Sequence, residues 1–137
     1  MEQNIIRGKR ILLVDDESGV RGAFRRMLEI DGHIVAEADN GAEALDLFTK
    51  GQFDLVTTDL EMPVMKGNEL AVRIKNLAPK QPILMITAYG KELVDSVNPV
   101  DSILSKPFTM DNLREAIAKL LPSQQIPSNL PVVGVKP

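Results

Sequence analysis

Four short apolar runs, rich in β-branched residues, alternate with amphipathic segments along this chain. They span residues 11–14, 34–36, 53–56 and 83–86, and a weaker fifth run spans residues 100–104. Two of them, ILLV and ILMI, are apolar throughout rather than at every second position, which is typical of parallel strands covered on both faces. The pattern therefore predicts an α/β fold, a doubly wound five-stranded parallel sheet with helices on both faces.

The segments between the runs have the apolar spacing of helices. Apolar residues recur at positions 20, 24, 27 and 28, at 70, 74 and 77, and at 113, 117, 120 and 121. This spacing gives each helix one apolar face. Asn40 with Glu43 predicts a capping box at the start of the second helix, and Thr109 is placed to cap the last helix. Strands and helices therefore alternate within one domain of about 115 residues.

The composition is that of an ordinary globular domain. Hydrophobic residues make up 44% of the 137 residues and charged residues 26%, unlike a disordered chain. Residues 122–137 are rich in proline and are expected to form a C-terminal tail with no output domain. No apolar stretch approaches the ~18 residues of a membrane span, and the first ten residues lack the apolar core of a secretory signal. We therefore expect a cytoplasmic protein without membrane insertion.

The charge balance and the lack of cysteine exclude several classes of function. A net charge of −3 disfavours direct binding to nucleic acid or to an anionic membrane, because such binding needs a basic surface. With no cysteine, the chain has no thiolate nucleophile, no disulfide and no cysteine-based zinc or iron–sulfur site. Any metal site must therefore be built without sulfur ligands.

Polar and charged residues follow four of the five runs. They are Asp15, Asp16 and Glu17 after the first run, Asp59 after the third, Thr87 after the fourth and Lys106 after the fifth. Taken singly, each has a structural explanation in a turn, a helix cap or a solvated surface. Because the carboxyl ends of parallel strands meet at one edge of the sheet, where ligands bind, their joint placement predicts a functional site.

The chemistry of that site follows from its residue types. Carboxylates within a few ångströms of one another repel, unless a cation compensates their charge. Oxygen ligands without histidine or cysteine favour Mg²⁺. Lys106 and Thr87 can contact phosphoryl oxygens, and one aspartate is then free to act as the nucleophile that accepts a phosphoryl group.

These motifs resemble the receiver domains of two-component response regulators. The matching segments are Asp15-Asp16, Asp59-Leu60-Glu61-Met62-Pro63, Thr87-Ala88 and Lys106-Pro107-Phe108, in the family's order and spacing. The resemblance covers residues 8–121, and the four motifs together are highly specific. It implies a flavodoxin-like strand order of 2-1-3-4-5 and a cis peptide bond before Pro107.

The resemblance also implies a role for each site residue. Asp59 would be the phosphoacceptor, and Thr87 and Lys106 would hold the phosphoryl group. The metal ligands would be Asp15, Asp16, Asp59 and the backbone carbonyl of Glu61, with Asp15 acting mainly through water. The donor would be a phosphohistidine on a sensor histidine kinase or a histidine phosphotransfer protein, and a downstream protein target is implied but not named. Such a chain catalyses its own phosphorylation but is not a turnover enzyme.

Two other functions remain open at this point. One is a docking module with a receiver fold that works without phosphorylation, although the complete acidic set with Thr87 and Lys106 argues against it. The other is a phosphatase with an aspartyl nucleophile. Those enzymes carry Asp-x-Asp on the first strand, whereas here Asp15 is followed two places later by Glu17.

Two departures from the family concern the output surface. Ile103 stands where receivers usually carry an aromatic residue, so we expect Tyr89 rather than Ile103 to move on phosphorylation. The stretch from Thr87 to Lys106 is short and contains Asn98-Pro99, which predicts a stunted fourth helix.

Two further sets of residues have simple interpretations. His33, the single histidine, lies at the start of the second strand and away from the site, so we expect a surface or strand-lining role rather than catalysis. The first helix carries a basic face, which is either only solvated or a contact for the kinase or phosphotransfer partner. This face consists of Arg21, Arg25 and Arg26.

Overall fold

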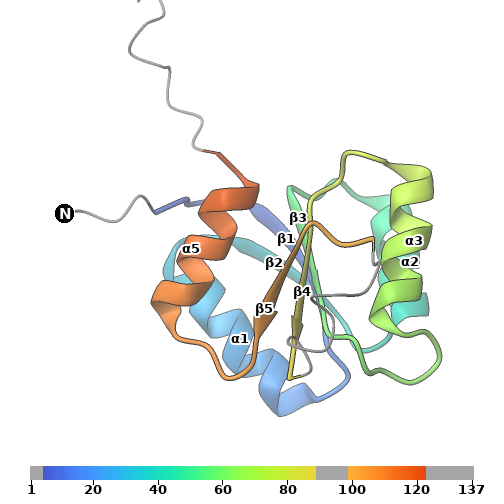
Figure 1. Cartoon of the computed structure of the whole chain (residues 1–137), viewed down its shortest axis with the longest axis horizontal. Coiled ribbons are helices and arrows are strands. Elements are labelled where there is room, and N and C mark those ends of the chain that lie inside the picture. Colours follow the sequence, from blue (N-terminus) through green and yellow to red (C-terminus); the bar gives the residue numbers. More distant parts are fainter. Residues whose placement is uncertain (1–4, 89–98, 123–137) are drawn as a thin grey trace, which may run out of the picture.

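A computed structural model of the chain describes residues 5–88 and 99–122, which contain five strands and four helices (Figure 1). The strands are β1 (Arg10–Val14), β2 (Ile34–Ala38), β3 (Leu55–Thr58), β4 (Ile83–Thr87) and β5 (Ser102–Ser105). The helices are α1 (Ser18–Ile30), α2 (Gly41–Lys50), α3 (Gly67–Leu77) and α5 (Met110–Leu120).

All five strands are parallel and lie in the order β2-β1-β3-β4-β5, as predicted. Helices α1 and α5 cover one face of the sheet, and α2 and α3 lie on the other (Figure 1). Successive side chains of β1 point to opposite faces of the sheet. Ile11 and Leu13 pack with α1 and α5, and Leu12 and Val14 pack with α2 and α3. This double burial explains why the ILLV run is apolar throughout.

The strand boundaries differ from the predicted runs by a few residues. The third strand begins at Leu55 and continues to Thr58, where the sequence predicted residues 53–56. The Asp54 carboxylate instead accepts a hydrogen bond from the Arg10 N–H at 2.9 Å, just before the strand starts. Thr57 and Thr58 are buried at its end. They extend the strand beyond the apolar run, because β-branched threonine suits a strand despite its hydroxyl group.

Both predicted helix caps are present, one of them in altered form. Thr109 and Asn112 form a complete capping box, with 3.0 Å for each of its two hydrogen bonds. Asn40 accepts a hydrogen bond from the Glu43 N–H at 2.9 Å, but the Glu43 carboxylate accepts from the N–H of Asp39 rather than Asn40. In the capping box expected for α2, the hydrogen bond to the Glu43 carboxylate therefore comes from the residue before the cap.

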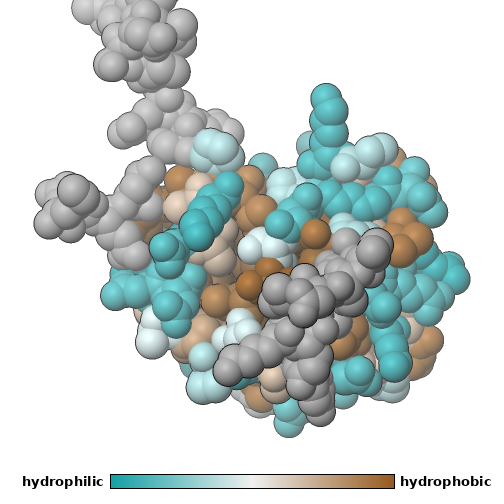
Figure 2. Space-filling model, in the orientation of Figure 1, coloured by the Kyte–Doolittle hydropathy of each residue, from teal (hydrophilic) through white to brown (hydrophobic). Residues whose placement is uncertain are grey.

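Apolar side chains remain visible between the two helical layers in Figure 2, over the edge strand β5. Ile103 and Leu104 of this strand are only half-buried within the described part of the chain. The predictions for Tyr89, for the fourth helix in residues 89–98 and for residues 123–137 lie outside the described residues. Among the helices that are described, none has the length and apolar character to cross a membrane.

Candidate functional site

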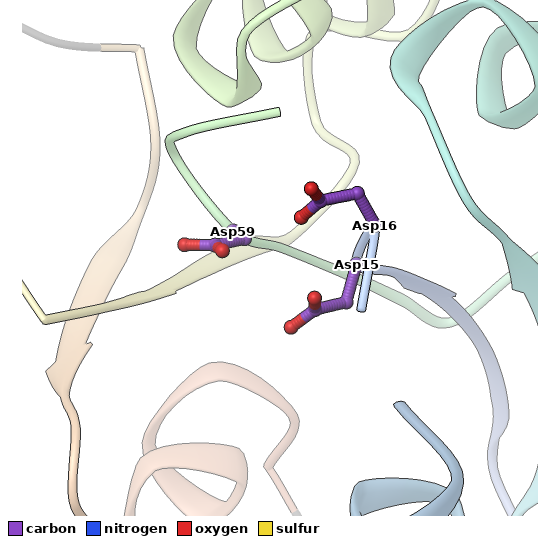
Figure 3. A group of neighbouring side chains, drawn as sticks. All are labelled: Asp15, Asp16 and Asp59. Atoms are coloured by element: carbon purple, nitrogen blue, oxygen red, sulfur yellow. The ribbon is translucent and has the colours of Figure 1, made fainter. Parts of the chain in front are cut away.

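The carboxyl ends of β1 and β3 bring three aspartates together. Asp15 follows β1, and its N–H bonds to the carbonyl of Ala38 at 3.1 Å; Asp59 follows β3, and its N–H bonds to the carbonyl of Val14 at 3.1 Å. One carboxylate oxygen from each of Asp15, Asp16 and Asp59 lies within 4.8 Å of the others. Figure 3 shows the three carboxylates directed to the same side. The sequence prediction that they meet at one edge is confirmed.

Lys106 brings a positive charge to this acidic cluster. Its Nζ lies 3.4 Å from Oδ2 of Asp15 and 3.5 Å from Oδ2 of Asp59. Its backbone N–H bonds to the carbonyl of Thr87 at 3.0 Å, so the pairing of β4 with β5 sets its position. The Lys106–Pro107 peptide bond is cis, as expected.

The three carboxylates are held to different degrees. Oδ1 of Asp15 accepts a hydrogen bond from the Glu17 N–H at 2.9 Å, and Oδ1 of Asp59 accepts one from the Leu60 N–H at 2.8 Å. Asp16 is exposed, and no hydrogen bond to its carboxylate comes from residues 5–88 or 99–122. Two of the carboxylates are therefore fixed by their own turns, while Asp16 depends on its backbone for direction.

Burial makes the negative charge of Asp59 costly. Desolvation is the main cause that raises the pKa of the Asp59 carboxyl above its usual value, and the charge of Asp15 acts in the same direction. The Lys106 ammonium and the hydrogen bond from Leu60 act against this rise but do not cancel it. A further cation beside Asp59 would therefore be stabilised by the site.

The donor set suits Mg²⁺. All three side chains offer hard oxygen ligands, and Mg²⁺ commonly combines one or two carboxylates with water and a phosphate oxygen. Opposite oxygens around one Mg²⁺ lie about 4.2 Å apart, and one oxygen from each of the three carboxylates lies within 4.8 Å of the others, so the group has the dimensions of a single cation site.

The loop after Asp59 is closed by a glycine that the sequence analysis did not identify. The Gly67 N–H bonds to the carbonyl of Leu60 at 2.8 Å, and a Cβ at Gly67 would lie 2.0 Å from the carbonyl oxygen of Asp59. Only glycine permits this approach. The sequence signal for this close approach is a glycine shortly after Asp59. In the structure this glycine is the first residue of α3.

The same loop contains an unusual turn. The Met65 N–H bonds to the carbonyl of Pro63 at 2.7 Å, which closes a three-residue turn around Val64. Val64 has a φ of 73°, and its residue surface is 79% exposed. A β-branched residue is strained at positive φ, so the loop beside Asp59 holds local backbone strain.

The predicted basic face of α1 is partly bound to the domain itself. Arg21 donates from Nε to the Glu37 carboxylate at 2.8 Å and from Nη1 to the carbonyl of Asp15 at 2.6 Å. Arg25 pairs with the carboxylates of Glu37 and Glu29. These two arginines lower the pKa of Glu37, with the hydrogen bond from Arg25 as the larger cause. A partner contact by this face stays a prediction.

The remaining predicted residues lie as follows. Thr87 is the last residue of β4 and is fully buried. Glu61 lies in the loop after β3, with its side chain exposed and 3.8 Å from the Nζ of Lys66. His33 lies at the amino end of β2, far along the strand from the acidic cluster. It is buried rather than at the surface, and its Nδ1 accepts a hydrogen bond from the Lys9 N–H at 2.9 Å.

Both the strand order and the acidic cluster are those of a two-component signalling domain. Residues 11–118 match the family described as the response regulator receiver domain, and the chain belongs to this family. It is similar to sporulation initiation phosphotransferase F of Bacillus subtilis, with 33% identity over 117 residues that cover 83% of this chain and 94% of that protein.

Solved structures give the same assignment. The chain is similar to the response regulator TrrA of Thermotoga maritima in complex with Mg²⁺-BeF, with 37% identity and a TM-score of 0.78 over 82% of this chain and 99% of TrrA. It is also similar to TrrA in the complex with the histidine kinase ThkA, with 37% identity and a TM-score of 0.74 over 82% of this chain and 98% of that one.

Proposed function

We propose that this receiver domain accepts a phosphoryl group on Asp59. One observation carries the proposal: the half-buried Asp59 carboxylate faces the Lys106 ammonium at 3.5 Å and lies beside two further carboxylates. A carboxylate is a competent phosphoryl acceptor where cations neutralise the charge of the incoming group. Lys106 supplies one such cation from the chain itself.

A bound Mg²⁺ would supply the second positive charge, offsetting both the repulsion between the carboxylates and the charge of the phosphoryl oxygens. The residues proposed to hold it are Asp15, Asp16, Asp59 and the backbone carbonyl of Glu61. The oxygen-only donor set supports this proposal, as does the Mg²⁺-BeF complex of TrrA.

The proposed reaction is a direct phosphoryl transfer from a phosphohistidine. An oxygen of Asp59 forms a bond to phosphorus while the bond between phosphorus and the donor's histidine nitrogen breaks. That nitrogen keeps the electron pair and takes up a proton. Lys106 and Thr87 donate hydrogen bonds to the phosphoryl oxygens, and the product is an aspartyl phosphate.

We further propose the setting of this reaction. Residues 8–121 form the receiver and residues 122–137 a tail, and the chain acts in the cytoplasm, where kinases form phosphohistidine from ATP. The donor is a histidine kinase or a histidine phosphotransfer protein, which the TrrA complex with ThkA supports. Output passes to a protein target through a conformational change or onward transfer. A docking role without phosphorylation is not favoured. Burial and the charge of Asp15 make the ionised form of Asp59 unfavourable, and a docking role does not require this carboxylate to be ionised.

Phosphorylation by a small donor tests the proposal. The protein is incubated with acetyl phosphate, with and without Mg²⁺, and its intact mass is measured. We expect the mass of one phosphoryl group to be added only with Mg²⁺ present, and Asp59→Asn to abolish the addition. Asp46→Asn is the matched control, because Asp46 lies on the exposed side of α2, where its carboxylate pairs with Lys50. An unchanged mass shift in Asp59→Asn contradicts the proposal.

A further inference from the structure

Arg21 connects helix α1 to the backbone of the acidic site. Its Nη1 donates to the main-chain carbonyl of Asp15 at 2.6 Å, and its side chain is only 16% exposed. The proposed transfer step itself does not involve this residue. The contact is nevertheless made to the first residue beyond β1, at the point where the chain leaves the sheet.

The carbonyl that Arg21 binds controls the direction of the next side chain. The peptide plane contains the carbonyl of Asp15 and the N–H of Asp16, so a fixed carbonyl fixes the path on which Asp16 departs. On the other side of Asp15, the N–H is already bound to Ala38. The Asp16 carboxylate has no hydrogen bond from the described residues, and this peptide is therefore its main support.

Glu37 holds Arg21 in place. It lies near the carboxyl end of β2 opposite Leu13, and its carboxylate accepts from Nε of Arg21 at 2.8 Å. Arg25 binds the second oxygen of the same carboxylate. Both arginines keep the pKa of Glu37 below its usual value, so the anchor stays charged at neutral pH. A planar guanidinium that donates in two directions loses little further freedom when it binds both groups.

We propose that Arg21 is a positioning residue for phosphorylation. By joining Glu37 to the carbonyl of Asp15, it orients the Asp15–Asp16 peptide so that both carboxylates face the metal beside Asp59. This inference rests on the proposed function of Asp59. Groups that orient metal ligands in this way typically change metal affinity by about 10- to 100-fold when they are removed.

Arg25 provides a charge-matched control. Arg21→Met and Arg25→Met each remove one positive charge and one partner of Glu37, but only Arg21 contacts Asp15. Loss of a nearby positive charge by itself would favour Mg²⁺ binding in both variants. A weaker affinity in Arg21→Met alone therefore reports the loss of orientation rather than the change of charge.

Titration of the apoprotein with MgCl₂, followed by the amide NMR shifts of Asp16 and Asp59, measures this affinity. We expect Arg21→Met to weaken Mg²⁺ binding about tenfold, and Arg25→Met to stay within about twofold of the wild type. Urea unfolding of both variants is measured alongside, to show that the difference does not follow from lost stability.

Equal Mg²⁺ affinity in the two variants overturns the inference. If Arg21→Met does not fold, Arg21→Lys replaces it: a single ammonium cannot hold Glu37 and the carbonyl together, so weaker binding is again expected, and wild-type affinity refutes the proposal. Failure of the proposed function looks different: the wild-type protein would then gain no phosphoryl mass from acetyl phosphate, whether or not Mg²⁺ shifts the amide signals of Asp16 and Asp59.

Discussion

The Nζ of Lys106 lies 3.5 Å from Oδ2 of Asp59 and joins the ends of β5 and β3 across the carboxyl edge of the sheet. β4 lies between these two strands in the sheet. The lysine side chain is long enough to reach across β4 and bring its ammonium to the Asp59 carboxylate. The ammonium lowers the pKa of Asp59, against burial, which raises it. The two residues therefore set how readily Asp59 carries the negative charge that a nucleophile needs.

Removing the ammonium should raise the pKa of Asp59 further. In Lys106→Met the opposing positive charge is lost while burial remains, so we expect the Asp59 carboxyl to titrate at a higher pH than in the wild type. Carboxyl ¹³C NMR of the Mg²⁺-free protein measures this pKa. Lys66→Met is the control, because Lys66 is exposed and pairs with Glu61 instead. An Asp59 pKa unchanged in Lys106→Met would show that the ammonium is not coupled to the carboxylate.

The charge of Asp59 should make the Mg²⁺-free protein less stable as the pH rises. The folded-state pKa of Asp59 is raised above its ordinary value of 3.8, so the folded state binds the proton more tightly than the unfolded state. This contribution is present in full below pH 3.8 and is lost as the pH rises through the folded-state pKa. Asp59→Asn removes it.

Comparing the two proteins isolates that contribution. We expect Asp59→Asn to have the higher free energy of unfolding at neutral pH, and the difference to shrink steadily as the pH falls. Urea unfolding over a pH series measures it. A difference that is constant with pH would contradict the raised pKa of Asp59.

A side chain at Gly67 should disrupt the loop that carries Asp59. In Gly67→Ala the new Cβ meets the Asp59 carbonyl oxygen at 2.0 Å, so the backbone must move. We expect a loss of about 2 kcal/mol or more in unfolding free energy, together with slower phosphorylation by acetyl phosphate. Gly19→Ala is the control: its Cβ meets open space in α1, and a gain of about 0.5 kcal/mol is expected.

Relieving the strain at Val64 should stabilise the protein. Asparagine tolerates positive φ far better than a β-branched residue, and Val64 is too exposed for its side chain to contribute much packing. We expect Val64→Asn to raise the free energy of unfolding by about 1 kcal/mol in urea denaturation. Val72→Asn, at a half-exposed position inside α3, should change it by less than about 0.5 kcal/mol. A stabilisation shared by both variants would show that it comes from replacing an exposed apolar side chain and not from relieving the backbone at Val64.

The architecture and the acidic cluster could be predicted because both follow from strand ends. Continuous apolar runs predict parallel strands, and parallel strands place their carboxyl ends at one edge, whatever the intervening loops do. Asp15 follows the first run directly, and Asp59 comes three residues after the third. Their meeting therefore required no knowledge of side-chain contacts.

The contacts that hold the acidic cluster and its loop in place could not be predicted, because they depend on the three-dimensional arrangement and not on a local sequence pattern. Glu37 meets Arg21 only because β2 pairs with β1 in one particular register, and a shift of one residue would turn it to the other face. The close approach of Gly67 to Asp59 and the positive φ of Val64 arise from how the loop returns to α3. A glycine or a valine in a loop does not by itself reveal such geometry.

Chemical trapping of the phosphoryl group tests the central claim most directly. The protein is phosphorylated with acetyl phosphate and Mg²⁺ and then treated with borohydride, which reduces an aspartyl phosphate to homoserine, and the position is read by peptide mass spectrometry. We predict homoserine at position 59, only when Mg²⁺ was present. Homoserine at position 15 or 16, or no homoserine in a protein that binds Mg²⁺, would contradict the assignment of Asp59 as the phosphoacceptor.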